Sequence, residues 1–363
     1  MTIHWPDPGP WFLAEIGTLF NQDIEVGKRL VRAVAAARDE AEMRGPFRIV
    51  LKGEILDDPN ICLPLPDYDE CYFPRGAGEV RENYRHLIER KTVSRDNYRR
   101  LYGLSAELGL PVCLSCYTVS GARFAVDELG AAGLKVASSN LTHVYLIGEM
   151  AKLASKHEIP LMIDTGRSSM AEIARAVDIV DRWLPRNALL IGHSPDGHPA
   201  EPDAHNLRMM GTLSAAFDGA HVGLSDHYDG ETMLYIAAAG DAWVEKTVCL
   251  DPQERDQEVA YAMPVQDLAR VVVECGRARL SIGRCFRNKE FTGCQAASSG
   301  MGLVAARDLH PGDRLVADDS VTFSFPARGI GAEHWETVAG WAVQGYIPAG
   351  APMQWSQIKR CEK

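Results

Sequence analysis

Ionisable residues stand at the ends of a series of short apolar runs in this chain. Their side chains are of the kinds that bind and react with anionic substrates. The carboxylates Glu15, Glu54 and Glu245 and the lysines Lys52 and Lys135 all stand at the ends of such runs. Lysines bind phosphate and carboxylate groups, whereas a carboxylate can hold a water molecule and take its proton. A purely structural sheet does not need titratable groups gathered at one point, so this pattern predicts an enzyme.

Eight apolar runs carry these residues, and segments with helical periodicity lie between them. The runs are Trp11–Thr18, Phe47–Glu54, Val112–Thr118, Leu134–Ser139, Pro160–Gly166, Leu189–Ser194, His221–His227 and Ala242–Val248. The helical segments include Glu25–Met43, Val144–Ser155 and Met170–Trp183. Strands and amphipathic helices that alternate in this way favour a closed parallel (β/α)8 barrel. The C-terminal strand ends of such a barrel converge on one face, which would bring the ionisable residues together.

Composition narrows the choice of partners and compartment. The net charge is −11 and no run of Lys or Arg occurs, which disfavours nucleic acid binding. No apolar stretch is long enough to span a membrane and the N-terminus lacks a signal-peptide pattern, so we expect a cytoplasmic protein without a membrane partner. Cys113 and Cys116 would point to opposite faces of one strand, so we expect reduced thiols rather than a redox or zinc pair.

Two segments depart from a plain barrel. Ile55–Tyr84 is rich in Pro, Asp and aromatic residues and follows the second strand, so it predicts a lid or a substrate wall. After the presumed eighth helix, Pro264–Ala278, a Gly/Ser-containing linker leads to short β-branched runs separated by turn signals. The expected organisation is a barrel over residues 1–280, a linker over 281–298 and a small β-rich domain over 299–363.

Six motifs in order give the chain a family likeness, and it resembles the sialic acid synthase (N-acetylneuraminate synthase) family over nearly its whole length. The motifs are AEIG (Ala14–Gly17), LKVASSN (Leu134–Asn140), DTG (Asp164–Gly166), GLSDHYDG (Gly223–Gly230), EKT (Glu245–Thr247) and ARDLHPGD (Ala306–Asp313). The resemblance implies a (β/α)8 TIM barrel with a C-terminal SAF (antifreeze-like) domain. It further implies that phosphoenolpyruvate (PEP) condenses with a sugar or other aldehyde to give a 2-keto-3-deoxy, sialic-acid-like acid.

The resemblance also implies a divalent metal, Mn2+ or Mg2+, and a homodimer in which the tail of one subunit caps the partner's barrel. Seven residues match family positions that bind substrate or do chemistry, and His227 among them matches one of two metal-binding histidines: Glu15, Lys52, Lys135, Ser138, Ser225, His227 and Asp256. A carboxylate, Glu15 or Glu245, could position the attacking water and move its proton, and in a reaction without a metal Lys246 could polarise the aldehyde.

Several positions depart from the family pattern. Thr247 replaces the second metal-binding histidine, and Glu54 replaces a glutamine. In the predicted substrate-binding set, Cys116 replaces a threonine, Asp164 a serine, and Asp196 and His198 an asparagine and a tyrosine. A tail arginine that would contact the sugar is also displaced, so Arg328 is the candidate substitute.

These departures leave four interpretations of the chemistry open. A relocated metal site could use His193 or His198 together with His227, or the condensation could run without a metal. The barrel could instead serve a PEP-independent keto-acid lyase or aldolase, or a non-catalytic paralogue that binds a sugar or a partner synthase. Single residues have simpler explanations as well: Glu15 and Lys52 could form a structural ion pair, Asp164 could cap a helix, and Cys116 could be an inert thiol.

Overall fold

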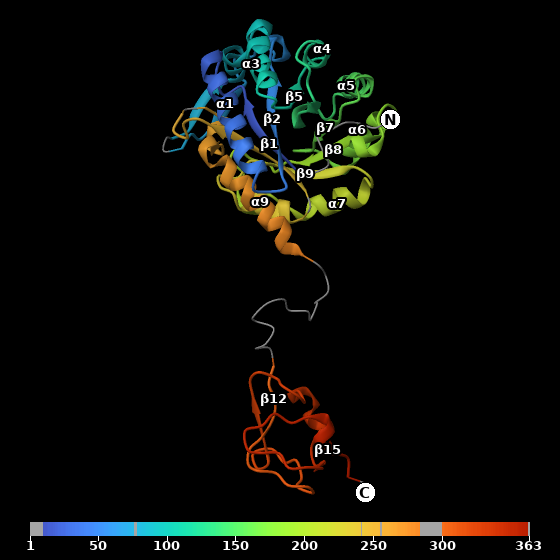
Figure 1. Cartoon of the computed structure of the whole chain (residues 1–363). Coiled ribbons are helices and arrows are strands. Elements are labelled where there is room, and N and C mark those ends of the chain that lie inside the picture. Colours follow the sequence, from blue (N-terminus) through green and yellow to red (C-terminus); the bar gives the residue numbers. More distant parts are fainter. Residues whose placement is uncertain (1–9, 76–77, 241, 255, 284–299, 362–363) are drawn as a thin grey trace. The chain divides into compact units, whose positions relative to one another are not determined.

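The structure is a computed structural model that describes residues 10–75, 78–240, 242–254, 256–283 and 300–361 (Figure 1). The chain divides into two compact units, residues 1–283 and residues 284–363. Most of the predicted linker, residues 284–298, lies outside the described residues. In the described ranges, no helix combines the length and apolar character that crossing a membrane requires.

The first unit is a closed barrel of eight parallel strands. In chain order they are β1 (Trp11–Gly17), β2 (Arg48–Ile55), β5 (Val112–Cys116), β6 (Gly133–Val136), β7 (Leu161–Asp164), β8 (Leu189–His193), β9 (His221–Asp226) and β10 (Trp243–Cys249). Neighbours in this order pair in parallel, and β10 returns to pair with β1. A short strand, β11 (Met263–Pro264), extends the sheet beside β10. The predicted (β/α)8 barrel is confirmed, and all eight predicted runs contain a strand.

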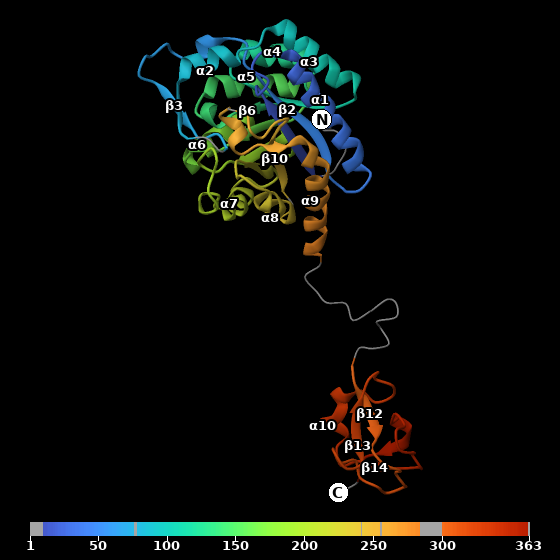
Figure 2. The same cartoon turned by 90° about the vertical axis from the view of Figure 1, so that its left-hand side faces the viewer.

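Eight helices follow the barrel strands and surround them (Figures 1 and 2). They are α1 (Ile24–Glu42), α3 (Arg95–Glu107), α4 (Val119–Asp127), α5 (Val144–His157), α6 (Met170–Val180), α7 (Arg208–Ala216), α8 (Thr232–Ala239) and α9 (Leu268–Ile282). Local sequence sets their starts: Asp23 caps α1, and Ser169 with Glu172 forms a capping box on α6. The main apolar core lies between these helices and the outward side chains of the strands.

Inward side chains form an apolar plug inside the barrel. Its members are one residue from each of six strands: Leu13, Val50, Cys113, Met162, Leu190 and Trp243. Successive strand residues point to opposite faces, so the residue two places further along each strand also points inward. Five of those six positions hold ionisable or hydroxyl side chains of the candidate site, and the sixth, beyond Leu190, is Gly192. Cys113 lies in the plug and Cys116 in the outer core, which confirms that these two free thiols face opposite sides.

The insertion after β2 has its own structure. It contains an antiparallel hairpin of β3 (Asp69–Tyr72) and β4 (Val80–Asn83), followed by α2 (Tyr84–Lys91). A small apolar cluster of Leu56, Cys62, Tyr72, Leu87 and Ile88 holds these pieces together. The insertion is therefore a folded wall with a core of its own.

The second unit is small and β-rich. It pairs β12 (Gly302–Ala305) with β13 (Val321–Ser324) and β14 (Ala342–Val343) with β15 (Ile358–Lys359), and it carries one short helix, α10 (Trp335–Val338). Its buried cluster includes Leu303, Leu315, Ile330, Ile347 and Met353. The predicted β-rich C-terminal unit is thus confirmed, and its described residues form an apolar core of their own.

Candidate active site

A layer of buried charged and hydroxyl side chains lies at the C-terminal end of the barrel interior. Glu15 forms an ion pair with Lys52. Lys135 bridges two carboxylates, with its Nζ 2.7 Å from Asp164 Oδ2 and 2.5 Å from Glu245 Oε1. Each of these residues stands two places beyond an apolar plug residue or a glycine, so strand alternation aims them all inward. We call Glu15, Lys52, Ser115, Lys135, Asp164, Ser225 and Glu245 the polar layer.

Glycines make room for this layer. A Cβ at Gly192 would collide with the carboxylate of Asp164, and a Cβ at Gly223 would collide with the indole of Trp243. Strands β8 and β9 therefore present only backbone at Gly192 and Gly223. The absence of side chains there leaves room for the indole of Trp243 beneath the polar layer and lets Asp164 reach Lys135.

Several acceptor atoms in the polar layer have no hydrogen-bond partner. These atoms are Asp164 Oδ1, Glu245 Oε2 and Ser115 Oγ, and all three are buried. A buried polar atom without a partner costs about 1–3 kcal/mol, and folded proteins retain few of them. Ser225 Oγ, in contrast, donates to Glu245 Oε1 at 3.0 Å. The layer thus holds unused hydrogen-bonding capacity, as a ligand site does.

Burial and neighbouring charges shift the protonation of the layer. Burial alone would lower the pKa of Lys135, but Asp164 and Glu245 raise it above its ordinary value. The pKa of Lys52 is shifted in the same way. Burial would lower it, but Glu15, Glu245 and Glu54 hold it well above the ordinary value. Burial raises the pKa of Asp164 in spite of Lys135. Both lysines therefore stay cationic at neutral pH, whereas Asp164 takes up a proton more readily than an exposed aspartate would.

A cavity of about 690 Å³ opens beside the layer at the barrel mouth. Residues that follow β1, β2, β5, β6 and β10 line it, including Thr18, Glu54, Tyr117, Asn140 and Glu258. The insertion after β2 supplies much of the rest, including Leu63, Tyr68 and Tyr84, as the prediction of a substrate wall requires. Glu54 joins this mouth cavity to the polar layer, because its Oε1 lies 3.0 Å from Tyr117 Oη and 3.5 Å from Lys52 Nζ.

Lys246 does not belong to the polar layer, which contradicts its expected catalytic role. It follows the inward Glu245 on β10 and therefore points outward, where its Nζ lies 2.8 Å from Asp226 Oδ2 and contacts the Tyr228 carbonyl. His205 Nε2 completes the group 3.1 Å from Asp226 Oδ1. We call Lys246, Asp226 and His205 the outer triad. Burial lowers the pKa of Lys246, although Asp226 opposes the shift.

Cys116 is likewise turned away from the site, which contradicts its expected substrate contact. Its side chain is fully buried in the outer core, and burial raises the pKa of its thiol well above the ordinary value. The inward residue on this strand is Ser115, which we had not assigned as a substrate contact. Its position two places after the plug residue Cys113 is the signal that identifies it.

Of the two histidines named as possible partners of His227, the structure brings one to it. The ring of His227 lies 4.3 Å from that of His198 and 5.0 Å from that of Tyr261, and its Nδ1 has no hydrogen-bond partner. His193 points elsewhere, with its Nε2 2.6 Å from the carbonyl oxygen of His205. The structure therefore brings His198, and not His193, to His227. Burial lowers the pKa of His227 well below its ordinary value and lowers that of His198 as well.

The histidine ring that lies beside the expected metal ligand His227 is that of His198. No group of three or more His, Cys, Asp or Glu side chains within the described ranges could hold one. Thr247 occupies the place of the expected second histidine, and its Oγ1 lies 3.2 Å from Glu15 Oε2. The rings of His198, His227 and Tyr261 pack against one another, with centroids 4.3 to 5.5 Å apart.

The remaining predicted residues lie around the site or apart from it. Asp256 Oδ1 lies 2.9 Å from Lys91 Nζ; burial would raise its pKa, but Lys91 and Arg90 hold it below the ordinary value. Ser138 Oγ accepts from Gly166 N at 3.1 Å. Asp196 is largely exposed and pairs with Arg167 at 2.6 Å. Arg328 is exposed on the C-terminal unit.

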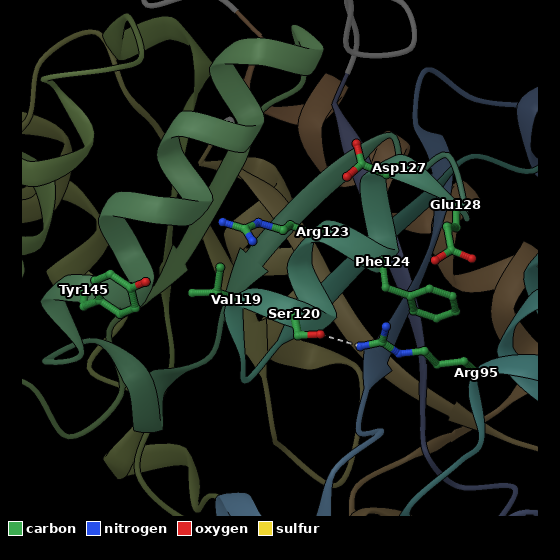
Figure 3. A pocket seen from close by; sticks show the side chains of 8 residues that line it. All are labelled: Arg95, Val119, Ser120, Arg123, Phe124, Asp127, Glu128 and Tyr145. Carbon is green, nitrogen blue, oxygen red and sulfur yellow. Dashed lines mark hydrogen bonds between the residues drawn. The ribbon is translucent and has the colours of Figure 1, made fainter.

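A second hollow, of about 350 Å³, lies outside the barrel between α3, α4 and α5 (Figure 3). Its cations already have partners: Arg95 bonds Ser120 Oγ and Asp57 Oδ2, each at 2.7 Å, and Arg123 lies 3.7 Å from Glu149. It has no connection with the polar layer and offers no free charge for a substrate.

Comparisons with known proteins agree with this geometry. Residues 67–286, more than half of the chain, match the profile of the NeuB family, and residues 300–359 match the SAF domain. The chain is 22% identical to the N,N'-diacetyllegionaminic acid synthase of Legionella pneumophila, over 96% of this chain and 94% of that protein. It is 25% identical to the N-acetylneuraminate-9-phosphate synthase of Mus musculus, over 86% of this chain and 84% of that protein.

Solved structures show the same fold. A putative spore coat polysaccharide biosynthesis protein E from Chromobacterium violaceum superposes with a TM-score of 0.68 at 21% identity, covering 96% of this chain and 99% of that one. An N-acetylneuraminic acid synthetase from Leptospira borgpetersenii gives a TM-score of 0.65 at 18% identity, covering 79% and 89%.

Proposed function

The chain belongs to the NeuB family, and we propose that it condenses PEP with an aldehyde to form a 2-keto-3-deoxy acid. The observation that carries this proposal is the polar layer, in which two buried lysines lie beside acceptor atoms that have no partner. Related synthases of sialic and legionaminic acids support a synthase on this barrel.

The two lysines suit the two anionic groups of PEP. Lys52 and Lys135 project from strands β2 and β6 and stay cationic, because the carboxylates around them outweigh the effect of burial. A bound phosphate and carboxylate would take over part of the role that Glu15, Asp164 and Glu245 now fill, and Ser115 and Ser225 can donate hydroxyl hydrogens. Protonation of Asp164 would remove one competing negative charge as PEP enters.

The reaction needs a nucleophilic carbon, a water molecule and a base. Carbon 3 of PEP attacks the aldehyde carbon, and the aldehyde oxygen takes up a proton. Water then adds to carbon 2 and loses one proton, which balances the proton taken up by the aldehyde oxygen. The bond between carbon 2 and the phosphate oxygen breaks, and the hydroxyl on carbon 2 passes its proton to the departing inorganic phosphate and becomes the keto group. The base in this proposal is Glu15, whose Oε1 pairs with Lys52 and whose Oε2 accepts from Thr247 Oγ1 at 3.2 Å and could accept a proton from the water.

One observation favours a second function. Asp164 stands where the resemblance expects a serine, and it places a second carboxylate on Lys135 at 2.7 Å. A lysine shared by two carboxylates attracts a dianionic phosphate less than a lysine with one. A keto acid carries a single carboxylate, so a PEP-independent lyase or aldolase is the alternative that this pair supports.

Phosphate release from PEP in the presence of an aldehyde panel separates the two functions. We expect phosphate release that depends on an aldehyde and falls about 1,000-fold in Lys52→Met, the loss typical of removing a charge that stabilises the reacting group. Lys152→Met on the surface of α5 is the matched control and should keep full activity. Turnover of a keto acid without phosphate would support the lyase. Absence of both reactions would support a binding role.

Running each assay after chelation, with Mn2+ or Mg2+ added back, tests the metal dependence. Light scattering tests the proposed homodimer.

A further inference from the structure

The lining of the mouth cavity is acidic and aromatic. Among the described residues that line it, the charged side chains are Glu54, Asp58, Glu258 and Lys91. Lys91 is not available to a ligand, because its side chain is 4% exposed and its Nζ lies 2.9 Å from Asp256 Oδ1. The described lining therefore offers carboxylates without a free cation.

Two of these carboxylates point their oxygens at the space next to the polar layer. Glu54 follows Lys52 on β2, and Tyr117 Oη donates to its Oε1 at 3.0 Å. Glu258 comes from the loop after β10, and its buried Oε2 has no hydrogen-bond partner. The other lining groups make local bonds: Asp58 accepts from Asn60 N at 2.9 Å, and His143 Nδ1 accepts from Leu146 N at 3.4 Å.

Tyrosine rings complete the wall. Tyr68 and Tyr84 lie with their ring centroids 5.0 Å apart, and Tyr117 faces the same cavity. Aromatic faces pack against the C–H surfaces of sugars, and carboxylates accept hydrogen bonds from hydroxyl and ammonium groups. A phosphate at this wall would meet the carboxylate of Glu54, and that of Glu258 once it is ionised, with no free cation among the described lining residues, and such like-charge contacts oppose binding.

We propose that Glu54 and Glu258, which line the mouth cavity, select an unphosphorylated aldehyde sugar over its phosphate ester. This inference rests on the proposed function, because that function makes the sugar the acceptor of the condensation. The preference for an unphosphorylated sugar depends on the charges of the cavity alone. Burial, reinforced by Glu54, Glu15 and Asp256 and opposed by Lys91, raises the pKa of Glu258 to about 8. The preference for the unphosphorylated sugar over its ester should therefore increase between pH 7 and pH 9, because Glu258 loses its proton in this range.

The test uses two matched probe pairs on the full-length protein: mannose with mannose 6-phosphate, and erythrose with erythrose 4-phosphate. Binding is measured by calorimetry with and without PEP, and phosphate release from PEP is measured in parallel. We expect the unphosphorylated member of at least one pair to bind about 100-fold more tightly than its ester, a discrimination that unpaired charges can supply. In the double variant Glu54→Gln/Glu258→Gln, the ratio of the two affinities should be about tenfold smaller than in the wild type. This ratio should also no longer rise between pH 7 and pH 9.

Glu128→Gln is the control, since Glu128 is an exposed partner of Arg99 far from the cavity lining in sequence and contacts. It should leave the ratio unchanged. Tighter binding of the esters, no binding of either unphosphorylated sugar, or an equal ratio in the double variant and the control would overturn the inference. Because binding is read without turnover, absent phosphate release would refute the proposed function while the selection by the cavity remained measurable.

Discussion

The polar layer and the outer triad are both buried charge clusters at the ends of barrel strands, yet they differ in one respect. In the outer triad every oxygen of Asp226 has a partner: Oδ1 faces His205 and the Tyr228 amide, and Oδ2 faces Lys246. In the polar layer, Asp164, Glu245 and Ser115 each keep an atom without a partner. The first cluster is complete in itself, whereas the second has bonding capacity left for a ligand.

The difference follows from a shift of one residue along a strand. Glu245 points into the barrel and Lys246 points out of it, so adjacent residues belong to different clusters. Charge alone does not mark a catalytic group, since both clusters contain a buried lysine. The distinguishing features are the direction of the side chain and the unsatisfied atoms around it. The predictions that follow test whether this distinction holds.

The largest effect is expected from Lys135→Met. Removal of this ammonium takes away the central cation of the polar layer, so PEP-dependent turnover should fall by about 1,000-fold. Steady-state kinetics and calorimetry with PEP would measure the loss. A variant that stays folded and binds PEP as the wild type does would place the anion site elsewhere.

The outer triad should respond in stability instead. Lys246→Met leaves Asp226 buried without its cation, and breaking such a pair typically costs about 3–5 kcal/mol in the free energy of unfolding. Denaturant titration would measure it, and PEP affinity of the folded protein should not change. Combining Lys246→Met with Asp226→Asn should recover part of the loss, because the uncompensated charge is gone. Loss of PEP binding in folded Lys246→Met would contradict the separation of the two clusters.

Glu258 should make the stability of the protein depend on pH. Its pKa is raised from 4.5 to about 8, chiefly by burial. The folded protein then holds a proton that the unfolded chain has released, so this group lowers the free energy of unfolding as pH rises from 4.5 through 8. Glu258→Gln should therefore be more stable than the wild type at pH 8.5 by roughly 1–3 kcal/mol, and the gain should vanish near pH 4.5. A gain that does not vary with pH would show that the carboxyl is ionised throughout.

The smallest effect concerns the second carboxylate on Lys135. Asp164→Asn keeps the shape of the side chain and removes its charge, so PEP should bind about tenfold more tightly, a difference of about 1.4 kcal/mol. The wild type should lose affinity relative to this variant as pH rises, because the raised pKa of Asp164 marks where its charge appears. Weaker binding in Asp164→Asn would mean that the carboxylate helps to hold the substrate, which favours the keto-acid alternative.

Strand patterning predicted most of the fold and the centre of the site. Eight apolar runs gave the barrel, and period-two alternation beyond Leu13 and Val50 brings Glu15 and Lys52 to one face. The errors arose where residues adjacent in a motif were assigned to one surface: Cys116 and Lys246 flank inward residues and therefore point outward. Glu258 was missed because it comes from a loop without periodicity, and only the folded chain places it at the mouth. The pairing of His198 with His227 likewise depends on loop folding that no local pattern encodes.

The most direct test of the account is thermal unfolding of the wild type, Lys135→Met and Lys246→Met with and without millimolar PEP. A ligand that binds only the folded state raises the melting temperature. We predict a clear rise with PEP for the wild type and for Lys246→Met, and none for Lys135→Met. No rise in the wild type, or an equal rise in Lys135→Met, would contradict the claim that the polar layer is the site for PEP.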